Sequence, residues 1–259
     1  MKKFTALLLA ILMTLTLFAG CGAKEDSDLA YVKKNGKLIV GITDYAPMDY
    51  KDENGNWTGF DAEFAQLVAK ELGVEVEFFV LSDWGQKFYE LETKNIDCVW
   101  NGMTITEEAL LNASVSDPYV INAQVIVMKA DVVGNYTDTD SLKGLTFAVE
   151  SGSAGEAALV DLGITGFTAL QDQTSALMEV KAGTAQACVI DITMANAMTG
   201  EGTNYADLAP GISLTSEEYG VAFRKGSDIT AEFNKIMAQL IADGTLQALA
   251  DKYQLTLAK

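Results

Sequence analysis

The chain has 259 residues, of which 49% are apolar, and its 36 acidic and 18 basic residues give a formal net charge of −18. This length suffices for one large or two small domains with hydrophobic cores. The acidic excess argues against nucleic acid and against electrostatic attachment to anionic lipid, because both need basic patches. Histidine is absent, which excludes a Ser-His-Asp triad, a Cys-His pair and the usual zinc sites. We expect neither a metal nor a cofactor, although carboxylates could still perform acid–base chemistry.

The first twenty residues are expected to be a secretory signal rather than part of the fold. Lys2 and Lys3 precede the apolar run FTALLLAILMTLTLFA, which is short for a membrane span. The run ends in LFAGC, which resembles the lipobox of bacterial lipoproteins, with Phe18 where that motif usually has leucine. We therefore predict that residues 1–20 are removed, that Cys21 is lipidated and that residues 21–28 form a polar tether. Ordinary secretion with an incidental cysteine is the alternative.

Two further cysteines, Cys98 and Cys188, lie in the short apolar stretches IDCVW and ACVID. We predict that both are buried free thiols that pack as small hydrophobic side chains. A disulfide is the alternative in an exported protein.

The first half of the chain alternates strand and helix patterns. Strands are expected over 37–43, 74–81 and 96–102, and helices over 59–73 and 85–95. Asp61 is expected to cap the first of these helices, and Gly73 to end it. Such alternation predicts a mainly parallel sheet with flanking helices.

The second half repeats this alternation. Strands are expected over 123–129 and 187–191, with a short strand at 166–171 and a helix at 175–185. Residues 141–163 should form a loop, a strand, a second loop and a helix, and a further helix should carry Phe233, Ile236 and Leu240 on one face until Gly244 ends it. The similarity of LETKNIDCVWNG to EVKAGTAQACVID indicates two lobes of related architecture.

The stretch NGMTITEEALLNASVSDPY, residues 101–119, suggests a small-molecule site. A glycine allows close approach of a ligand, and a helix is expected to begin near Thr106, where unpaired N–H groups favour an anion. However, no lysine or arginine lies between Lys94 and Lys129, so the sequence offers no nearby cation.

Ordered motifs from Leu38 to Tyr253 resemble the amino-acid family of extracellular solute-binding proteins, which supply ABC importers. They are GFDAEFAQLVAKELGVEVEF, NIDCVWNGMTIT, SDPY, QVIVMK, LKGLTFAVESGS, ACVID, EEYGVAFRKGSD and ADGTLQALADKY. The resemblance implies a two-lobed periplasmic-binding-protein-like α/β fold, with residues 29–123 and 217–259 in one lobe, 124–216 in the other, and two hinge strands between them. It also implies a monomer outside the cytoplasm, with importer permease subunits as partners. A lipid anchor at Cys21 would suit a Gram-positive surface.

The resemblance also implies which residues contact the ligand: Asp44, Tyr45, Trp84, Asn101, Gly102, Thr104, Ser153 and Asp191. Asp191 would pair with the ligand's ammonium group, and Ser153 would contact its carboxylate. Trp84 would stack on the ligand's side chain, although core packing is the alternative for it and for Trp100. Asp44 lies in a loop that is one residue shorter than is usual in the family.

One departure from the family concerns Ala109, where an arginine typically binds the ligand's α-carboxylate. The only arginine in this chain is Arg224. The ligand could therefore be an amino acid held unusually, or a cationic amine without a free carboxylate. Two other functions stay open: a ligand-sensing surface lipoprotein, and a dehydratase-like enzyme that uses Asp191, Glu150 and Asp44. Glu150 could face either the cleft or solvent.

Overall fold

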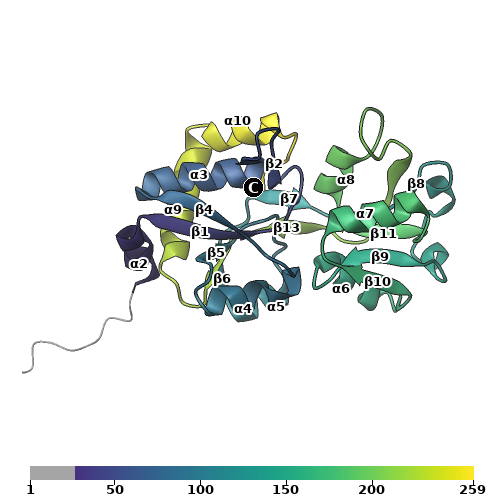
Figure 1. The fold of residues 1–259 in the computed structure, drawn as a ribbon, viewed down its shortest axis with the longest axis horizontal. Coiled ribbons are helices and arrows are strands. Elements are labelled where there is room, and N and C mark those ends of the chain that lie inside the picture. The colour runs from purple at the N-terminus through teal and green to yellow at the C-terminus, as the bar shows by residue number, and fades with distance from the viewer. Residues whose placement is uncertain (1–26) are drawn as a thin grey trace, which may run out of the picture.

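Two five-stranded sheets organise residues 27–259, the part of the chain that the computed structural model describes. The predicted signal, Cys21 and residues 21–26 of the predicted tether lie outside these described residues. One sheet has the order β4-β1-β5-β14-β6 and the other β10-β9-β11-β8-β12. We call the first sheet with its helices lobe 1 and the second with its helices lobe 2. They lie side by side in Figure 1.

Both lobes alternate strands and helices, as the sequence predicts. Lobe 1 contains α2 (Asp28–Asn35), β1 (Lys37–Ile42), β2 (Tyr50–Lys51), β3 (Trp57–Thr58), α3 (Phe60–Leu72), β4 (Glu75–Val80), η1 (Trp84–Gln86), α4 (Lys87–Glu92), β5 (Cys98–Val99), α5 (Glu107–Asn112), β6 (Ala113–Val115), β14 (Ala222–Arg224), α9 (Ile229–Ala242) and α10 (Thr245–Lys252). Lobe 2 contains β8 (Gln124–Lys129), η2 (Val133–Asn135), η3 (Asp140–Leu142), β9 (Phe147–Glu150), α6 (Ala154–Asp161), β10 (Phe167–Leu170), α7 (Gln173–Ala182), β11 (Ala187–Asp191), α8 (Ile192–Met198) and β12 (Leu208–Ser213).

The two sheets share one pattern of strand directions. In lobe 1, β1 runs parallel to β4 and β5, whereas β14 is antiparallel to β5 and β6. In lobe 2, β9 runs parallel to β10 and β11, whereas β8 is antiparallel to β11 and β12. Each sheet is therefore mostly parallel with one reversed strand, which confirms the predicted fold class.

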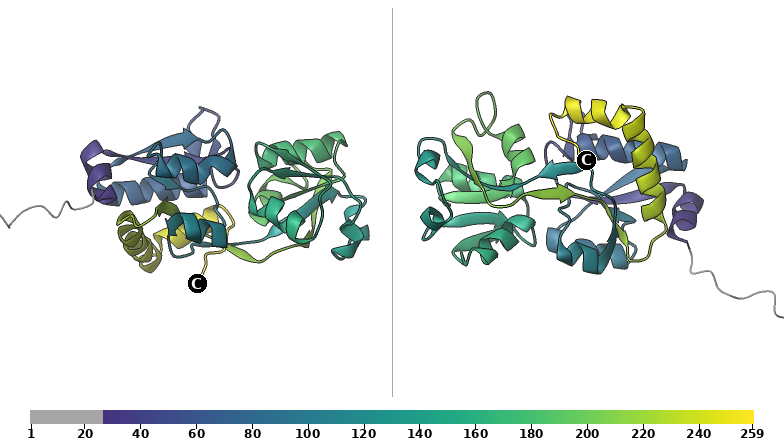
Figure 2. Two further views of the ribbon diagram at one scale, coloured as in Figure 1. Left: turned by 90° about the horizontal axis from the view of Figure 1, so that it is seen from below. Right: turned by 180° about the vertical axis from the view of Figure 1, so that it is seen from behind.

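The lobes are joined by two hinge strands, β7 (Val120–Asn122) and β13 (Glu217–Tyr219), which pair antiparallel with Asn122 opposite Glu217. Seen from behind in Figure 2, these segments run side by side from one lobe to the other. The strand that follows each crossing, β8 or β14, is the reversed strand of its sheet.

Helix α3 begins differently from the prediction. Its N-cap is Gly59 at φ 116°, with no side-chain cap, whereas Asp61 is buried and accepts hydrogen bonds from Gly102 N at 2.6 Å and the Tyr119 hydroxyl at 2.8 Å. The expected capping role of Asp61 is therefore wrong, because its side chain points into the lobe. Gly73 ends the helix in the left-handed conformation, as predicted.

Helix α2 is absent from the sequence-based predictions. Ser27 caps it, and its first residue, Asp28, pairs with Arg224 at 2.9 Å. The predicted tether 21–28 thus overlaps the fold at Asp28. Arg224 also pairs with Asp97 at 3.0 Å, so this arginine of β14 links α2 to the segment before β5.

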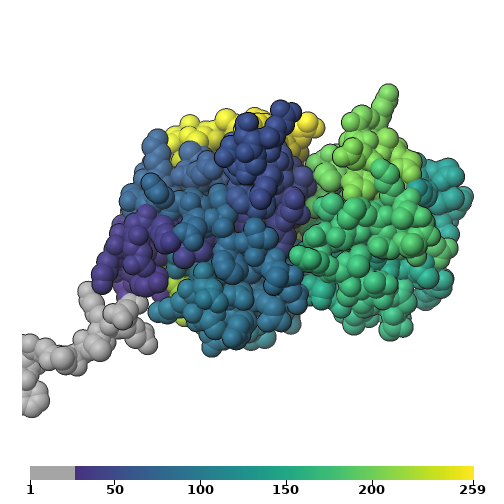
Figure 3. Space-filling view, viewed as in Figure 1, coloured from purple at the N-terminus to yellow at the C-terminus, as the bar shows by residue number. Residues whose placement is uncertain are grey.

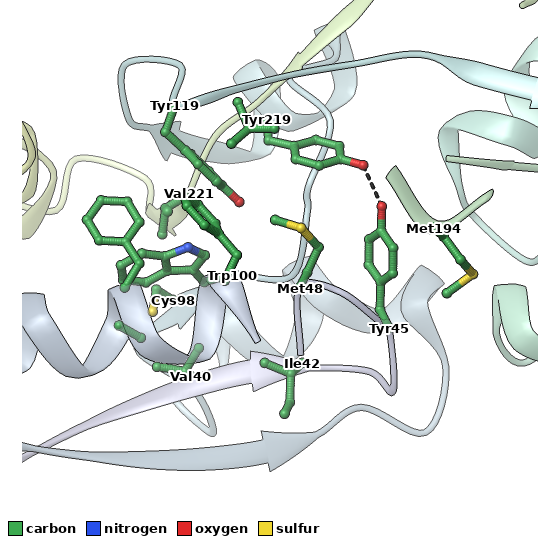
Figure 4. Close-up of a cluster of buried hydrophobic side chains, with 14 of the residues drawn as sticks. Val40, Ile42, Tyr45, Met48, Cys98, Trp100, Tyr119, Met194, Tyr219 and Val221 are labelled. Carbon is green, nitrogen blue, oxygen red and sulfur yellow. Dashed lines mark hydrogen bonds between the residues drawn. The ribbon is translucent and has the colours of Figure 1, made fainter. Parts of the chain in front are cut away.

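The largest core cluster contains Trp100, which packs edge-on against Phe64 and Phe233 with ring centroids 4.8 and 5.0 Å apart. Trp100 is fully buried, so core packing accounts for it (Figure 4). Cys98 and Cys188 are free and buried, as predicted.

None of the helices within residues 27–259 is both long and apolar enough to span a bilayer.

Candidate functional site

A cavity of about 230 Å³ lies between the lobes. Its lining comes from both lobes: Tyr45, Trp84, Lys87, Asn101, Gly102, Met103, Thr104, Thr106, Glu107, Glu108 and Ala109 from lobe 1, and Gln124, Glu150, Gly152, Ser153, Ala154, Ala157, Gln173 and Asp191 from lobe 2. On the face drawn in Figure 3, the two lobes meet along their shared boundary.

The lobes touch directly at two places beside this cavity. The Tyr45 hydroxyl hydrogen-bonds to Thr193 Oγ1 at 2.5 Å, and Lys87 Nζ donates to the Gly152 carbonyl at 3.2 Å. A Cβ added to Gly152 would lie 2.8 Å from Gly85 Cα. The two lobes are therefore in direct contact beside the cavity.

Asp191, the last residue of β11, lines the cavity and is buried. The side-chain amides of Asn122, Gln124 and Gln173 donate to its carboxylate, the Gln124 bond being 2.8 Å long. Gln173 Oε1 also accepts from the backbone N–H of Asp191 at 2.9 Å. The carboxylate is therefore held in one orientation by neutral donors.

Glu217 of β13 places a second carboxylate behind Asp191. Glu217 Oε1 accepts from Asn122 at 2.6 Å, Gln124 at 2.7 Å and Thr104 at 2.9 Å, so both acids share two amide donors. Among residues 27–259, no ion pair within 4.0 Å includes either acid. Burial and the charge of Glu217 raise the pKa of Asp191 to about 7. A ligand cation at Asp191 would relieve this repulsion.

Glu150 ends β9, is buried and lines the same cavity. Of the two orientations left open by the sequence, the structure has it facing the cleft. Burial, followed by the charges of Asp191 and Asp172, raises its pKa to about 8. Lobe 2 thus presents two carboxyl groups with raised pKa values, and a positive charge added to the cavity would lower both pKa values.

Lys87, the first residue of α4, is the cation that the sequence reasoning missed. It lines the cavity, is only 6% exposed, and its Nζ lies 4.9 Å from the Trp84 ring centroid. Burial lowers the pKa of its ammonium group, opposed by the negative charges of Glu108 and Glu150. The position of Lys87, three residues after the predicted cleft residue Trp84, could have indicated that this lysine also reaches the cavity. The turn at η1, which brings it there, was not predicted.

Three predicted residues, Asn101, Gly102 and Thr104, line the cavity, but the side chains of Asn101 and Thr104 have other partners. Asn101 bonds to Thr43 and Asp49, and Thr104 donates to Glu217. A Cβ on Gly102 would lie 2.5 Å from the Tyr45 ring, and its φ is +55°. The loop therefore approaches the cavity chiefly with its backbone.

Trp84, Tyr45 and Ser153 also line the cavity. Trp84 combines this with packing in a core cluster, so the two expected alternatives coexist. The Tyr45 hydroxyl bonds to Tyr219 at 2.5 Å (Figure 4) and also to Thr193. Ser153 caps α6 by accepting from Glu156 N at 3.1 Å.

Asp44 differs from the other predicted residues because it is exposed and does not line the cavity. Burial and the charge of Asp172 nevertheless raise its pKa. Ala109 is buried and lines the cavity beside the start of α5, which begins after Thr106 as predicted; the Thr106 side chain caps this helix. With only six residues, α5 is too short to serve as an anion site by its dipole alone.

The described residues contain no cluster of acids and cysteines that could hold a metal ion. The cavity lining offers four carboxyl groups, one ammonium group, amides, hydroxyls and an aromatic face, which suits a small polar ligand that carries an amine, with Lys87 available to a negative group.

Comparisons with known proteins agree on one family. Residues 38–256 match the family described as bacterial extracellular solute-binding proteins, family 3. The chain is similar to the L-cystine-binding protein TcyJ of Escherichia coli (strain K12), at 32% identity over 252 residues, covering 93% of this chain and 92% of TcyJ. The solved structure of the P235GK mutant of ArgBP from T. maritima is 34% identical, with a TM-score of 0.81, 87% of this chain and 98% of that chain being covered. An ancestral amino acid-binding protein described as a precursor of cyclohexadienyl dehydratase is 33% identical, with a TM-score of 0.80 and coverage of 88% and 99%.

Proposed function

We propose that this chain, which belongs to family 3 of the bacterial extracellular solute-binding proteins, captures a zwitterionic amino acid between its lobes and delivers it to an ABC importer. The observation that carries this proposal is the arrangement of opposite charges around one interlobe cavity, with Asp191 and Glu150 on lobe 2, and Lys87 together with Glu107 and Glu108 on lobe 1. Proteins that bind cystine and arginine are among its similar relatives.

The Asp191 carboxylate would pair with the ligand's ammonium group and accept hydrogen bonds from it. Three amides hold its carboxylate, and its nearest charged neighbour is another acid, Glu217. A buried carboxylate without a cation is costly, so an ammonium group there would be bound tightly. Tyr45, Trp84, Asn101, Gly102, Thr104 and Ser153 would complete the site through ring, backbone and hydroxyl contacts. Asp44 is omitted because it is exposed outside the cavity.

Ligand capture would work by hinge closure. The two units would be residues 29–123 with 217–259, and residues 124–216, turning about β7 and β13. The contacts of Lys87 with Gly152 and of Tyr45 with Thr193 join the two lobes and would be lost if the lobes opened. A ligand that contacts both lobes would favour this state over an open one.

The protein would act outside the cytoplasm as a monomer, tethered by lipid on Cys21 and docking on permease subunits. The motif LFAGC after the apolar run supports the anchor. The acidic balance supports solubility at a cell surface rather than adhesion to anionic lipid headgroups.

A thermal-shift screen of amino acids, together with their decarboxylated amines, tests this function. A ligand that binds only the folded state stabilises it by about 2.7 kcal/mol at a hundred times its Kd, so a hit should raise the Tm by several degrees. At least one amino acid should do so. If none does while an amine does, the ligand is a cationic amine without a carboxylate.

An enzyme remains the second candidate, because Glu150 and Asp191 are buried acids with pKa values near neutrality and one similar structure is an ancestor of a dehydratase. Incubation of the hit with the protein, followed by mass spectrometry, separates the two functions. Recovery of the unchanged ligand supports a binding protein, and conversion to a product would establish an enzyme.

A further inference from the structure

We propose that Lys87 is the specificity residue for the ligand's carboxylate, taking the place of the arginine that the family usually carries at the position of Ala109. This inference rests on the proposed function and deepens it, since it assigns the ligand class to compounds with a carboxylate as well as an amine. It also replaces the sequence-based premise that the cavity lacks a cation.

The first argument is the state of the Lys87 side chain. Its ammonium group is buried, and among residues 27–259 no carboxylate oxygen lies within 4.0 Å of it. Its acceptors are two neutral carbonyls, Trp84 O at 3.4 Å and Gly152 O at 3.2 Å. An ammonium group has three donors, so one donor remains for a partner in the cavity, and no carboxylate of the described residues is in direct contact with the charge.

The second argument is location. Lys87 shares the cavity wall with Ala109 of lobe 1 and with Ser153 and Ala154 at the start of α6 in lobe 2. The centroids of the Trp84 and Phe88 rings lie 4.9 and 5.0 Å from Nζ, and these rings limit the positions that the ammonium group can take. A carboxylate placed at Lys87 would also meet the donor end of an eight-residue helix.

The third argument is that no other cation competes for this role. Lys87 is the single lysine or arginine of the described residues that lines the cavity. Arg224 is committed to Asp28 and Asp97 elsewhere in lobe 1. A zwitterion could contact Lys87 on one lobe with its carboxylate and Asp191 on the other lobe with its ammonium group. It would favour the closed state, because only there can both of its charged groups reach their partners at once.

The alternative is that Lys87 is structural, balancing the negative charge of Glu150 and Glu108 without touching the ligand. Its removal would then weaken an amino acid and the matching amine alike. A carboxylate-binding lysine predicts instead a loss confined to the ligand that has the carboxylate.

The experiment is calorimetric titration of wild type, Lys87→Met, Lys87→Arg and Lys70→Met with the best amino acid of the screen and with its decarboxylated amine. Met keeps the length and apolar stem of the side chain without the charge. Lys70 is an exposed lysine at the end of α3 and serves as the matched control. Lys87→Met should lose at least about tenfold in affinity for the amino acid, the range expected for a charged hydrogen bond. Its affinity for the amine should change by less than about threefold.

A transplant variant, Lys87→Met with Ala109→Arg, restores a cation from the family's usual position and should recover amino-acid affinity above that of Lys87→Met. Equal losses for both ligands, or binding of the amino acid to Lys87→Met within about threefold of wild type, would overturn the inference. If wild type binds no amino acid at all, the proposed function fails first and this inference fails with it. If Lys87→Met does not fold, the smaller change Lys87→Arg must preserve the preference of wild type for the amino acid over the amine.

Discussion

Asp191 is the residue on which the ammonium site depends, because three side-chain amides orient its buried carboxylate toward the cavity. Asp191→Asn keeps the shape but removes the charge, so a buried ammonium would lose its partner, at a cost of several kcal/mol. We expect amino-acid affinity to fall by roughly 100-fold or more, measured by calorimetry.

The matched control for this substitution is Asp161→Asn, which changes an exposed acid at the end of α6 in the same lobe. Its affinity should equal that of wild type. An affinity of Asp191→Asn that equals the control value would remove Asp191 from the proposed site.

The two cavity acids should also make the stability of the ligand-free protein depend on pH. Burial raises the pKa of Glu150 from 4.5 to about 8 and that of Asp191 from 3.8 to about 7. The folded state therefore binds more protons than the unfolded state between about pH 4 and pH 8, so the stability that protonation supplies is fully present below about pH 4 and is lost progressively as the pH rises to about 8.

We expect the urea concentration at the unfolding midpoint of the ligand-free protein to decrease as the pH is raised from about 5.5 to 8.5. The decrease should be smaller in Glu150→Gln, because its side chain cannot ionise. Saturating amino acid should reduce the fall, because a cation lowers both pKa values. An identical pH dependence in wild type and Glu150→Gln would show that Glu150 does not titrate in this range.

The loop at 151–153, between β9 and α6, packs against lobe 1, and we predict that its fit there controls closure. Gly152 adopts φ +68°, and its added Cβ would lie 2.8 Å from Gly85 Cα of η1 across the lobe boundary. Gly152→Ala should therefore hinder closure and strain the turn, with amino-acid affinity expected to fall about tenfold or more.

The control for Gly152→Ala is Gly134→Ala, since a Cβ on Gly134 meets no atom within 4 Å. Calorimetry supplies the affinities, and small-angle scattering at saturating ligand supplies the compactness. If Gly152→Ala binds and compacts like the control, the 151–153 loop does not govern closure.

Local patterns were enough to predict many of the elements, but not α2, α8, β12 or β14. Apolar runs such as KLIVGI and ACVID identify β1 and β11, and Gly73 identifies the end of α3. Helix α2 escaped prediction because its polar sequence is stabilised by a partner distant in the chain, Arg224.

The site was predictable only in part. Residues at the ends of strands, such as Asp191, can be recognised because parallel strands bring their carboxyl ends to one edge. The partners Lys87, Glu217 and Gln124 reach the cavity or its acid network through the η1 turn and the hinge crossings, which are set by the packing of the lobes rather than by local pattern. The side-chain partners of Asn101, Thr43 and Asp49, were not predicted for the same reason.

The whole molecule carries a formal charge of −18, which would draw amine-bearing solutes toward the cleft and weaken with added salt. The acids are spread over both lobes, so this field would speed the arrival of amine-bearing solutes without distinguishing an amino acid from its amine. Selection between an amino acid and its amine is assigned to the short-range contacts at Lys87 and Asp191.

Attachment of the molecule to a membrane is predicted to depend on Cys21. Wild type expressed in a bacterial host should sediment with membranes, whereas Cys21→Ser should be released, because a serine cannot carry the thioether-linked lipid. Cys98→Ser, which changes a buried thiol, is the control and should fractionate like wild type. Equal solubility of wild type and Cys21→Ser would contradict lipid anchoring.

The central claim is that a zwitterion bridges the two lobes, and a crystal structure of the complex with the best amino acid of the screen tests it most directly. Our account predicts closed lobes, with the ligand's ammonium nitrogen about 3 Å from a carboxylate oxygen of Asp191 and a carboxylate oxygen of the ligand about 3 Å from Lys87 Nζ. A ligand bound outside the interlobe cavity, or one bound with its carboxylate turned away from Lys87, would contradict it.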